Sequence, residues 1–349
     1  MISSVAIIGL GAAARTIHIP AIKKLGRLRI VGGYDTSGVA KDTRFPVFSS
    51  VAEMLERVSP EMVVIATPPS SHFELARQCL ASGCHVFCEK PLAENVSDAR
   101  KLAELAAEAG RHVFINSEFP WMPIHSAAKR AMSEPGFGRL QFISMHQTFV
   151  VNAETERGWR GEELQRTFKE FGTHTLDLAS YFYNEAPRAV RARMPKPAGP
   201  GSPDLLNMVE LEFSGDRYAL IVLDRLSKGR HRYLDIRLDG ETASIETSIG
   251  GQMRVSLGLN AKTRRPFFDL DISMGGRARL FHGEQSRTLA TAPLDLFADA
   301  TARLLGDALD AIQKGKPPPN ALPQATRTLE LLLASYASAA DGLRRELPG

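Results

Sequence analysis

The first third of the chain alternates short apolar segments with amphipathic ones. Helical periodicity separates the apolar segments, which are the length of strands. The apolar segments are Val5–Gly9, Leu28–Asp35, Met62–Thr67, His85–Glu89 and Val113–Asn116, and the helical ones are Ala13–Lys24, Val51–Val58, Ser71–Ser82 and Val96–Ala109. Continuous apolar strands that alternate with helices indicate a parallel sheet with both faces covered. The pattern therefore predicts an α/β domain of the doubly wound Rossmann type over residues 1–120.

The pattern changes after residue 120. Two helical segments, His125–Ser133 and His174–Tyr183, flank a strand at Leu140–Gln147. Strands then follow without helices between them, at Ala189–Met194, Met208–Phe213, Tyr218–Asp224, Arg232–Leu238 and Ser244–Ser248, and two long helical segments end the chain at Ala292–Lys314 and Leu322–Leu343. Consecutive strands joined by tight turns form antiparallel sheets. Residues 121–349 are therefore predicted to form an α+β domain with a large, mostly antiparallel sheet.

Composition narrows the class of protein. The net charge is +4, and Lys and Arg are spread along the chain without a basic block, so we expect no nucleic-acid partner. No apolar stretch approaches the length of a membrane span, which is about 18 residues or more. The start of the chain lacks the basic region of a signal sequence, and Cys79, Cys84 and Cys88 show neither disulfide nor metal-site spacing. These features predict a cytoplasmic protein with buried thiols and no metal.

A glycine-rich turn follows the first strand. Residues 9–14 match the pattern G-x-G-x-x-A, with a strand before the motif and a helix after it. The first glycine permits a tight turn, the second allows backbone N–H groups to approach a pyrophosphate, and Ala14 allows close packing of helix on strand. The motif predicts that a dinucleotide binds at Gly9, Leu10, Gly11, Ala12 and Ala13.

A residue at the end of the second strand bears on whether the protein prefers NAD or NADP. Asp35 lies 21 residues after Ala14, where a carboxylate can accept hydrogen bonds from the ribose 2′-OH and would repel a 2′-phosphate. This favours NAD, with Thr36 as a neighbouring contact. Polar and basic residues follow closely, at Ser37, Lys41 and Arg44, so NADP stays possible.

Several segments together resemble one enzyme family. Cys88-Glu89-Lys90-Pro91-Leu92 resembles the signature of the Gfo/Idh/MocA oxidoreductases, which include glucose–fructose oxidoreductase and myo-inositol dehydrogenase. The resemblance covers almost the whole chain and also rests on residues 9–14, 66–72, 159–160, 172–177 and the C-terminal pattern from Leu296 to Ala340. It implies that Thr67, Pro68, Pro69, His72 and Glu89 line the cofactor.

The resemblance also implies an activity and an assembly. Members of the family combine a Rossmann domain with a second domain whose open sheet commonly forms the subunit interface. The chain is therefore expected to be an NAD(P)-dependent dehydrogenase acting on a hydroxyl of a sugar, a cyclitol or a related polyol. It is also expected to form a homodimer or homotetramer.

Three residues are the expected catalytic groups. By resemblance, Lys90 orients the substrate hydroxyl and relays its proton, and His174 is the general base, since its ordinary pKa of about 6.5 suits proton transfer near neutrality. His174 is predicted to start a helix, whose positive end disfavours imidazolium. Glu170 stands where the family usually has Asp in a glycine-rich approach; here the carboxylate is kept on a longer side chain and the glycines are absent. Glu170 could act on the substrate directly or form a surface salt bridge with Lys169 or Arg166.

Four other residues are candidates for binding substrate or cofactor, and each also has a structural explanation. Trp159 and Arg160 could wall the substrate pocket or belong to the core. Asp177, one turn after His174, could contact a substrate hydroxyl or complement the start of the helix. Asn116 could contact the cofactor near the nicotinamide or form a turn.

Two further functions compete with the dehydrogenase. One is an enzyme that reduces a keto-sugar in a biosynthetic pathway or keeps its cofactor tightly bound. The other is a non-catalytic NAD-binding regulator, a class that typically lacks the Lys/His pair. The chain shows no Ser/His/Asp ordering and no P-loop, so hydrolysis and phosphoryl transfer are not indicated.

Overall fold

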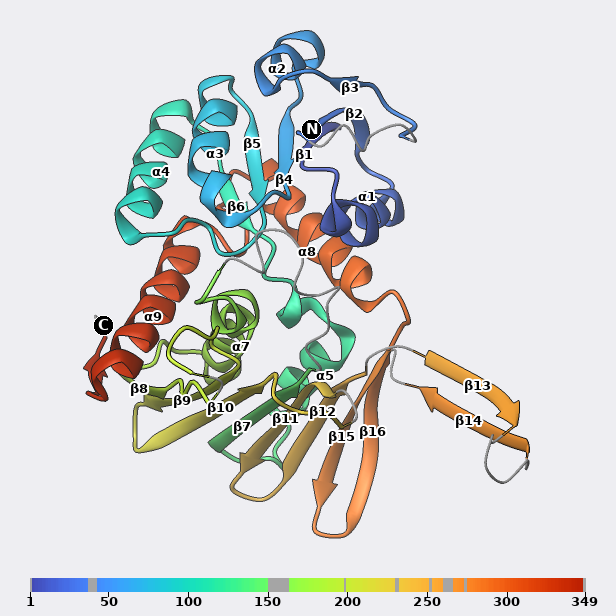
Figure 1. The fold of residues 1–349 in the computed structure, drawn as a ribbon, viewed down its shortest axis with the longest axis vertical. Helices are drawn as coiled ribbons and strands as arrows, with labels where there is room; N and C mark the ends of the chain where they lie inside the picture. Colours follow the sequence, from blue (N-terminus) through green and yellow to red (C-terminus); the bar gives the residue numbers. More distant parts are fainter. Residues whose placement is uncertain are drawn as a thin grey trace. The chain divides into compact units, whose positions relative to one another are not determined.

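The chain divides into two units. The computed structural model describes residues 2–347 except 37–42, 150–162, 198, 230–231, 251–252, 260–265 and 273–274. The first unit consists of Met1–Trp121 and Phe297–Leu333, and the second consists of Met122–Leu296 and Ala334–Gly349 (Figure 1).

The first unit is built on a six-stranded sheet of order β3-β2-β1-β4-β5-β6 in which all neighbours are parallel. The strands are β1 (Ser4–Ile8), β2 (Arg29–Tyr34), β3 (Val47–Phe48), β4 (Met62–Ile65), β5 (His85–Cys88) and β6 (Val113–Ile115). The predicted doubly wound parallel sheet is confirmed. Strand β3 was not predicted, because two residues are too few to show a period.

Helices cover both faces of this sheet (Figure 1). They are the continuous segment of η1 (Ala14–His18) and α1 (Ile19–Leu25), then α2 (Val51–Val58), α3 (His72–Ala81) and α4 (Val96–Ala109). The predicted ranges of α2 and α4 match to the residue. Ser50 and Asn95 begin these two helices, since their side chains accept hydrogen bonds from the N–H of Glu53 and Asp98.

A helix from the end of the chain completes the core of the first unit. One face of α8 (Leu296–Gln313) packs Leu304, Leu305 and Ala308 in a single cluster with Val5 and Phe87 of the sheet. The prediction that everything after residue 120 belongs to the second domain is therefore wrong for Phe297–Leu333. An amphipathic pattern shows that a helix buries one face, but it does not show which sheet receives that face.

The second unit is built on a nine-stranded sheet of order β16-β15-β12-β11-β7-β10-β9-β8-β17, antiparallel except for β7 and β10. Its strands are β7 (Leu140–Thr148), β8 (Ala189–Arg193), β9 (Leu206–Phe213), β10 (Arg217–Asp224), β11 (Arg232–Gly240), β12 (Ser244–Ile249), β15 (Gly276–His282), β16 (Gln285–Ala292) and β17 (Arg345–Glu346). Strands β13 (Met253–Leu259) and β14 (Pro266–Ile272) form a separate ribbon. The predicted mostly antiparallel sheet is confirmed.

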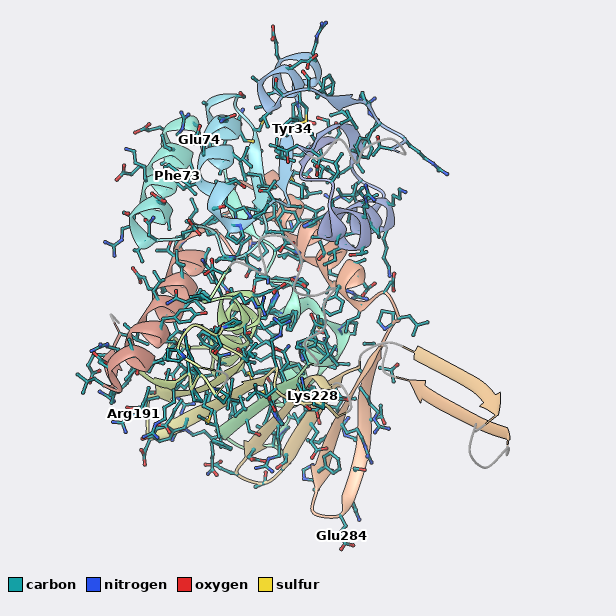
Figure 2. All side chains as sticks on the ribbon, in the orientation of Figure 1. Tyr34, Phe73, Glu74, Arg191, Lys228 and Glu284 are labelled. Carbon is teal, nitrogen blue, oxygen red and sulfur yellow. The ribbon has the colours of Figure 1, made fainter. Side chains whose placement is uncertain are left out.

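Helices cover one face of the nine-stranded sheet. Helix α5 (Pro123–Ala131) contacts β12, β15 and β16, and α7 (Thr173–Tyr183) contacts β7. On β10, Ala219, Ile221 and Leu223 are fully buried on the covered face, whereas Leu220 on the other face is 39% exposed. Glu284 lies at the tip of the hairpin of β15 and β16, at the rim of this sheet (Figure 2).

Two further findings concern membranes and thiols. None of the helices in the described part of the chain is both long and apolar enough to cross a membrane. The three cysteines are free and buried, as predicted. Burial raises the pKa of the Cys84 thiol to about 11, so this thiol stays protonated near neutrality.

Candidate functional site

Four loops of the first unit meet at one edge of the parallel sheet, because each follows the carboxyl end of a neighbouring strand. Backbone hydrogen bonds continue the ladder beyond the strands. Ala66 donates to Ile8, Glu89 donates to Ile65, and Asn116 donates to Cys88, each at 2.8 Å. Ligands of open parallel sheets bind at this edge. The sequence motifs at residues 9–13, 67–72, 89–90 and 116 are therefore neighbours in space.

The glycine turn is tight at its first glycine and open at its second. Gly9 has φ +88°, and a Cβ there would lie 2.7 Å from the carbonyl oxygen of Ala66. A Cβ on Gly11 would meet no atom of the described residues within 4 Å, and Gly11 and Ala12 are exposed. The start of the helix that follows is thus accessible, and the first N–H groups of a helix have no partner within it.

Asp35 is held beside this turn. The backbone N–H of Leu10 donates to Asp35 Oδ2 at 2.6 Å, and Arg15 Nε donates to the carbonyl oxygen of Leu10 at 2.9 Å. The carboxylate is half-buried, and Thr36 beside it is exposed. An accessible helix start next to a fixed carboxylate suits a pyrophosphate and a ribose. The residues present therefore fit a dinucleotide.

His72 links two of the four loops. It is fully buried, and its Nδ1 and Nε2 lie 2.8 Å and 2.9 Å from the carbonyl oxygens of Pro91 and Thr67. Burial lowers the pKa of His72, and the contacts with these two oxygens oppose that effect. The imidazole is occupied by protein groups, so we expect it to shape the cofactor loops rather than to contact the cofactor itself.

Glu89 lies at the centre of a buried hydrogen-bond network. Its Oε1 is 2.8 Å from Nε2 of His18 and accepts a hydrogen bond from Nδ2 of Asn116 at 2.9 Å. Thr301, on α8, donates to Oδ1 of Asn116 at 3.1 Å. The ring of His18 meets Phe87 edge-on at 5.5 Å. The network thus joins the helix after the glycine turn, the ends of β5 and β6, and α8.

This network keeps Glu89 ionised. Burial by itself would raise the pKa of Glu89, but the hydrogen bond and charge of His18, the charge of Lys90 and the bond from Asn116 outweigh it and lower the pKa to about 2. A carboxylate that stays charged fixes the donors around it. Because both ends of the Asn116 amide are engaged, Asn116 is placed to act through Glu89. Lys90, the next residue, is half-buried.

The other predicted catalytic residues lie on one helical segment of the second unit. Glu170 is in the π-helical turn η4 (Phe168–Gly172), and His174 and Asp177 are buried on α7 directly after it. Glu170 is half-buried. Residues three and four apart share a helix face, so these three side chains can serve one substrate. Trp159 and Arg160 lie outside the described residues.

The helix that carries His174 begins earlier than predicted. Helical structure starts at Thr167 and passes through η4 without a break. His174 is therefore almost two turns from the start of the helix, and the argument that a helix end disfavours its imidazolium form is wrong. Asp177 is further still from that end, which excludes the interpretation that it complements the helix start.

Two family models match the chain. The first, the Gfo/Idh/MocA oxidoreductase family with an NAD-binding Rossmann fold, matches residues 3–117. The second, the C-terminal domain of the same family, matches residues 125–246. Together these ranges cover more than half of the chain.

The chain belongs to the Gfo/Idh/MocA family.

Curated relatives of this family member include sugar and inositol dehydrogenases. D-apiose dehydrogenase of Paraburkholderia graminis is 24% identical over 98% of this chain and 89% of its own length. Inositol 2-dehydrogenase of Rubrobacter xylanophilus is 32% identical over 48% of each chain. The chain spans about half the length of the first curated relatives that it matches. The family model is described as that of an oxidoreductase family, and both named relatives are dehydrogenases.

A solved structure shows the same fold over the whole length of the chain. An oxidoreductase from Agrobacterium radiobacter, in complex with NAD+, L-tartaric acid and magnesium, has a TM-score of 0.80 and 18% sequence identity. It covers 99% of this chain and 98% of its own. The structural likeness agrees with the NAD-binding domain that the family model assigns to residues 3–117.

Replacing Glu89 by Gln tests the buried network through the pH dependence of stability. The pKa of Glu89 is about 2 when folded and 4.5 ordinarily, so its stabilising contribution is complete above pH 4.5 and is lost as the pH falls toward 2. We expect Glu89→Gln to lower the free energy of unfolding at pH 6, and the gap from wild type to shrink by roughly 2 kcal/mol at pH 3.

Urea denaturation at both pH values measures this gap. Glu56→Gln, which makes the same change of charge on the exposed side of α2, is the control and should leave stability almost unchanged. A gap for Glu89→Gln that is the same at both pH values would show that Glu89 is not a buried carboxylate held in its charged form.

Proposed function

We propose that this protein is an NAD-dependent dehydrogenase that transfers a hydride between a hydroxyl-bearing carbon of a sugar, a cyclitol or a related polyol and the nicotinamide. The observation that carries the proposal is the convergence of the glycine turn, Asp35 and the Glu89–Lys90 loop at the carboxyl edge of one parallel sheet. When bound, NAD supplies a ring that accepts or donates the hydride.

Lys90 is proposed to hold the substrate hydroxyl. The residue directly follows Glu89, which His18 and Asn116 fix, so its backbone position is determined by the buried network. An ammonium group donates hydrogen bonds to a hydroxyl oxygen and stabilises the negative charge that develops there when the proton leaves.

His174 is proposed to take the hydroxyl proton. A neutral imidazole accepts a proton near neutral pH, and a carboxylate one turn away stabilises the imidazolium that forms. Glu170 supplies that carboxylate, in place of the Asp usual in the family. Asp177, one turn further along α7, is the proposed contact for a second hydroxyl of the substrate.

NAD is the proposed cofactor in preference to NADP. Asp35 faces the turn with one oxygen fixed by Leu10 N–H, and a fixed carboxylate binds a ribose diol but repels a phosphate. In support of the substrate class, the relatives include D-apiose dehydrogenase and inositol 2-dehydrogenase, and a third is glucose-6-phosphate 3-dehydrogenase of Bacillus subtilis.

Turnover assays test this function directly. The purified chain is incubated with NAD or NADP and with myo-inositol, D-apiose, D-glucose or glucose 6-phosphate, and reduced nicotinamide is followed by absorbance. We expect turnover with NAD to exceed turnover with NADP. We also expect Lys90→Ala and His174→Ala to reduce kcat by about 10² to 10⁴-fold, the range for loss of an acid–base group.

Two surface variants serve as controls. Lys101→Ala on α4 and His282→Ala at the end of β15 replace exposed residues of the same types, so both should retain kcat within roughly twofold. NAD titration of each variant shows whether it is folded. An active substrate for which Lys90→Ala and His174→Ala keep full turnover would refute the assignment of these residues.

The exposed face of the nine-stranded sheet is the proposed interface of a homo-oligomer. At its centre, Leu220 lies between Tyr218 and Val222 on β10, which pair with Phe142 on β7 and Met208 on β9. Leu220 is 39% exposed and the other four are half-buried. Polar residues lie between them, since Leu220 is opposite Ser144 on β7 and Glu210 on β9, so this face is mixed. Exposed apolar side chains on the uncovered face of a sheet, rimmed by polar ones, support a site of protein association.

Leu220→Glu is expected to dissociate this oligomer, because it removes the most exposed apolar side chain at the centre of the proposed interface and adds a second carboxylate beside Glu210. Light scattering of the purified chain should give a multiple of 38.2 kDa for wild type and the monomer mass for the variant. Leu294→Glu, at a leucine that is 60% exposed outside the sheet, should behave as wild type. A monomeric wild-type chain would contradict the proposed interface.

A further inference from the structure

Two distant side chains hold the start of the helix that carries Glu170 and His174. Four consecutive backbone N–H groups, from Arg166 to Lys169, donate to them. Asp204 Oδ1 accepts from Arg166 and Thr167 at 2.9 Å and 2.8 Å, and Asp204 Oδ2 accepts from Phe168 at 3.0 Å. The hydroxyl oxygen of Tyr336 accepts from Lys169 at 3.1 Å.

These four donors are the ones that a helix leaves without internal partners. The first bond within the helix is already closed by Glu170, whose N–H donates to the carbonyl oxygen of Arg166 at 2.7 Å. Helices usually begin with a local Ser, Thr, Asp or Asn cap. Thr167 does not fill this role, since its buried Oγ1 makes no hydrogen bond among the described residues. The helix is therefore capped by Asp204 and Tyr336, which are remote from it in sequence.

The two capping residues are themselves fixed. Tyr336 donates its hydroxyl to Asp204 Oδ2 at 2.8 Å, and its ring meets Phe168 edge-on at 5.8 Å. Asn207 donates to the carbonyl oxygen of Asp204 at 2.9 Å, at the start of β9. Asp204 is 2% exposed. The helix start is thus tied to the nine-stranded sheet on one side and to α9 (Leu322–Asp341) on the other.

A cap formed by residues remote in sequence affects the position of the helix as well as its stability. A local cap moves with its own helix, whereas a cap 38 and 167 residues away in sequence fixes the end of the helix relative to the rest of its unit. Glu170 directly follows the capped groups, and His174 lies one turn after it. A shift or rotation at the start of the segment would therefore move both side chains, and a displacement of about 1 Å can reduce a reaction rate by 10²-fold.

We propose that Asp204 and Tyr336 are positioning residues that set the placement of Glu170 and His174 for proton transfer. The proposal rests on the proposed function for the kinetic role of these two residues, but the capping geometry stands independently of it. Asp204 accepts four hydrogen bonds, three from backbone N–H groups and one from the Tyr336 hydroxyl. Its role requires a carboxylate, which the isosteric amide of Asn cannot replace, because one end of an amide is a donor.

Three variants separate positioning from general stability. Asp204→Asn keeps the shape and removes half of the acceptors, and Tyr336→Phe removes only the hydroxyl. Tyr183→Phe is the matched control, since Tyr183 lies at the far end of α7 and its buried hydroxyl donates to the carbonyl oxygen of Tyr218 at 2.6 Å. The control loses a buried hydroxyl from the same unit without touching the start of the helix.

Hydrogen exchange of the full chain tests the cap without any substrate. We expect the amides of 166–169 to exchange about tenfold faster or more in Asp204→Asn and Tyr336→Phe, with exchange in β7 and β9 much less changed. Tyr183→Phe should leave these four amides protected. Unchanged protection of the four amides in both capping variants would overturn the proposal.

Kinetics with the most active substrate of the panel tests the positioning role. After correction for the fraction of chains that bind NAD, kcat should fall between about 10-fold and 100-fold in Asp204→Asn and Tyr336→Phe, with the affinity for NAD unchanged. Tyr183→Phe should keep kcat. Faster exchange with unchanged kcat would overturn the positioning role. Absence of turnover in wild type would instead contradict the proposed function, and the exchange experiment would still decide the cap.

Discussion

Neighbouring parallel strands end at the same edge of their sheet, and the candidate cofactor site depends on this constraint. The loops after β1, β4, β5 and β6 are up to about a hundred residues apart in sequence, yet hydrogen bonds of 2.8 Å join the strand ends in series. The order of the strands alone therefore brings the glycine turn, His72 and Glu89 to the same edge of the sheet. Close packing of Gly9 against Ala66 sets the depth of the turn, and the open surface at Gly11 leaves the helix start accessible.

A second constraint positions the polar side chains within each unit, because most buried polar groups in folded proteins are hydrogen-bonded. In the first unit, His18 and Asn116 form hydrogen bonds with the Glu89 carboxylate. These bonds fix Glu89, which directly precedes Lys90. In the second unit, Asp204 and Tyr336 accept hydrogen bonds from the four N–H groups before Glu170 that have no partner within the helix. In both cases the residues proposed to act on substrate adjoin a buried network that is completed by residues remote in sequence.

The sequence predicted the parallel sheet, its helices and the position of the glycine turn, because strand and helix periods and turn chemistry are local properties. It did not show that α8 completes the first unit, since an amphipathic stripe does not identify its partner. His18, Thr301, Asp204 and Tyr336 also escaped prediction, because each acts through one tertiary contact and carries no motif of its own. The start of the His174 helix was misplaced for the same reason, as its cap comes from residues 204 and 336.

We expect the carboxyl edge of the six-stranded sheet to bind NAD. Isothermal titration calorimetry of the intact chain with NAD and NADH measures this binding without knowledge of the substrate. The account predicts a saturable heat with one dinucleotide bound per chain, and weaker binding of NADP because the Asp35 carboxylate would repel a 2′-phosphate. The absence of any binding heat with NAD, NADH and NADP would contradict it.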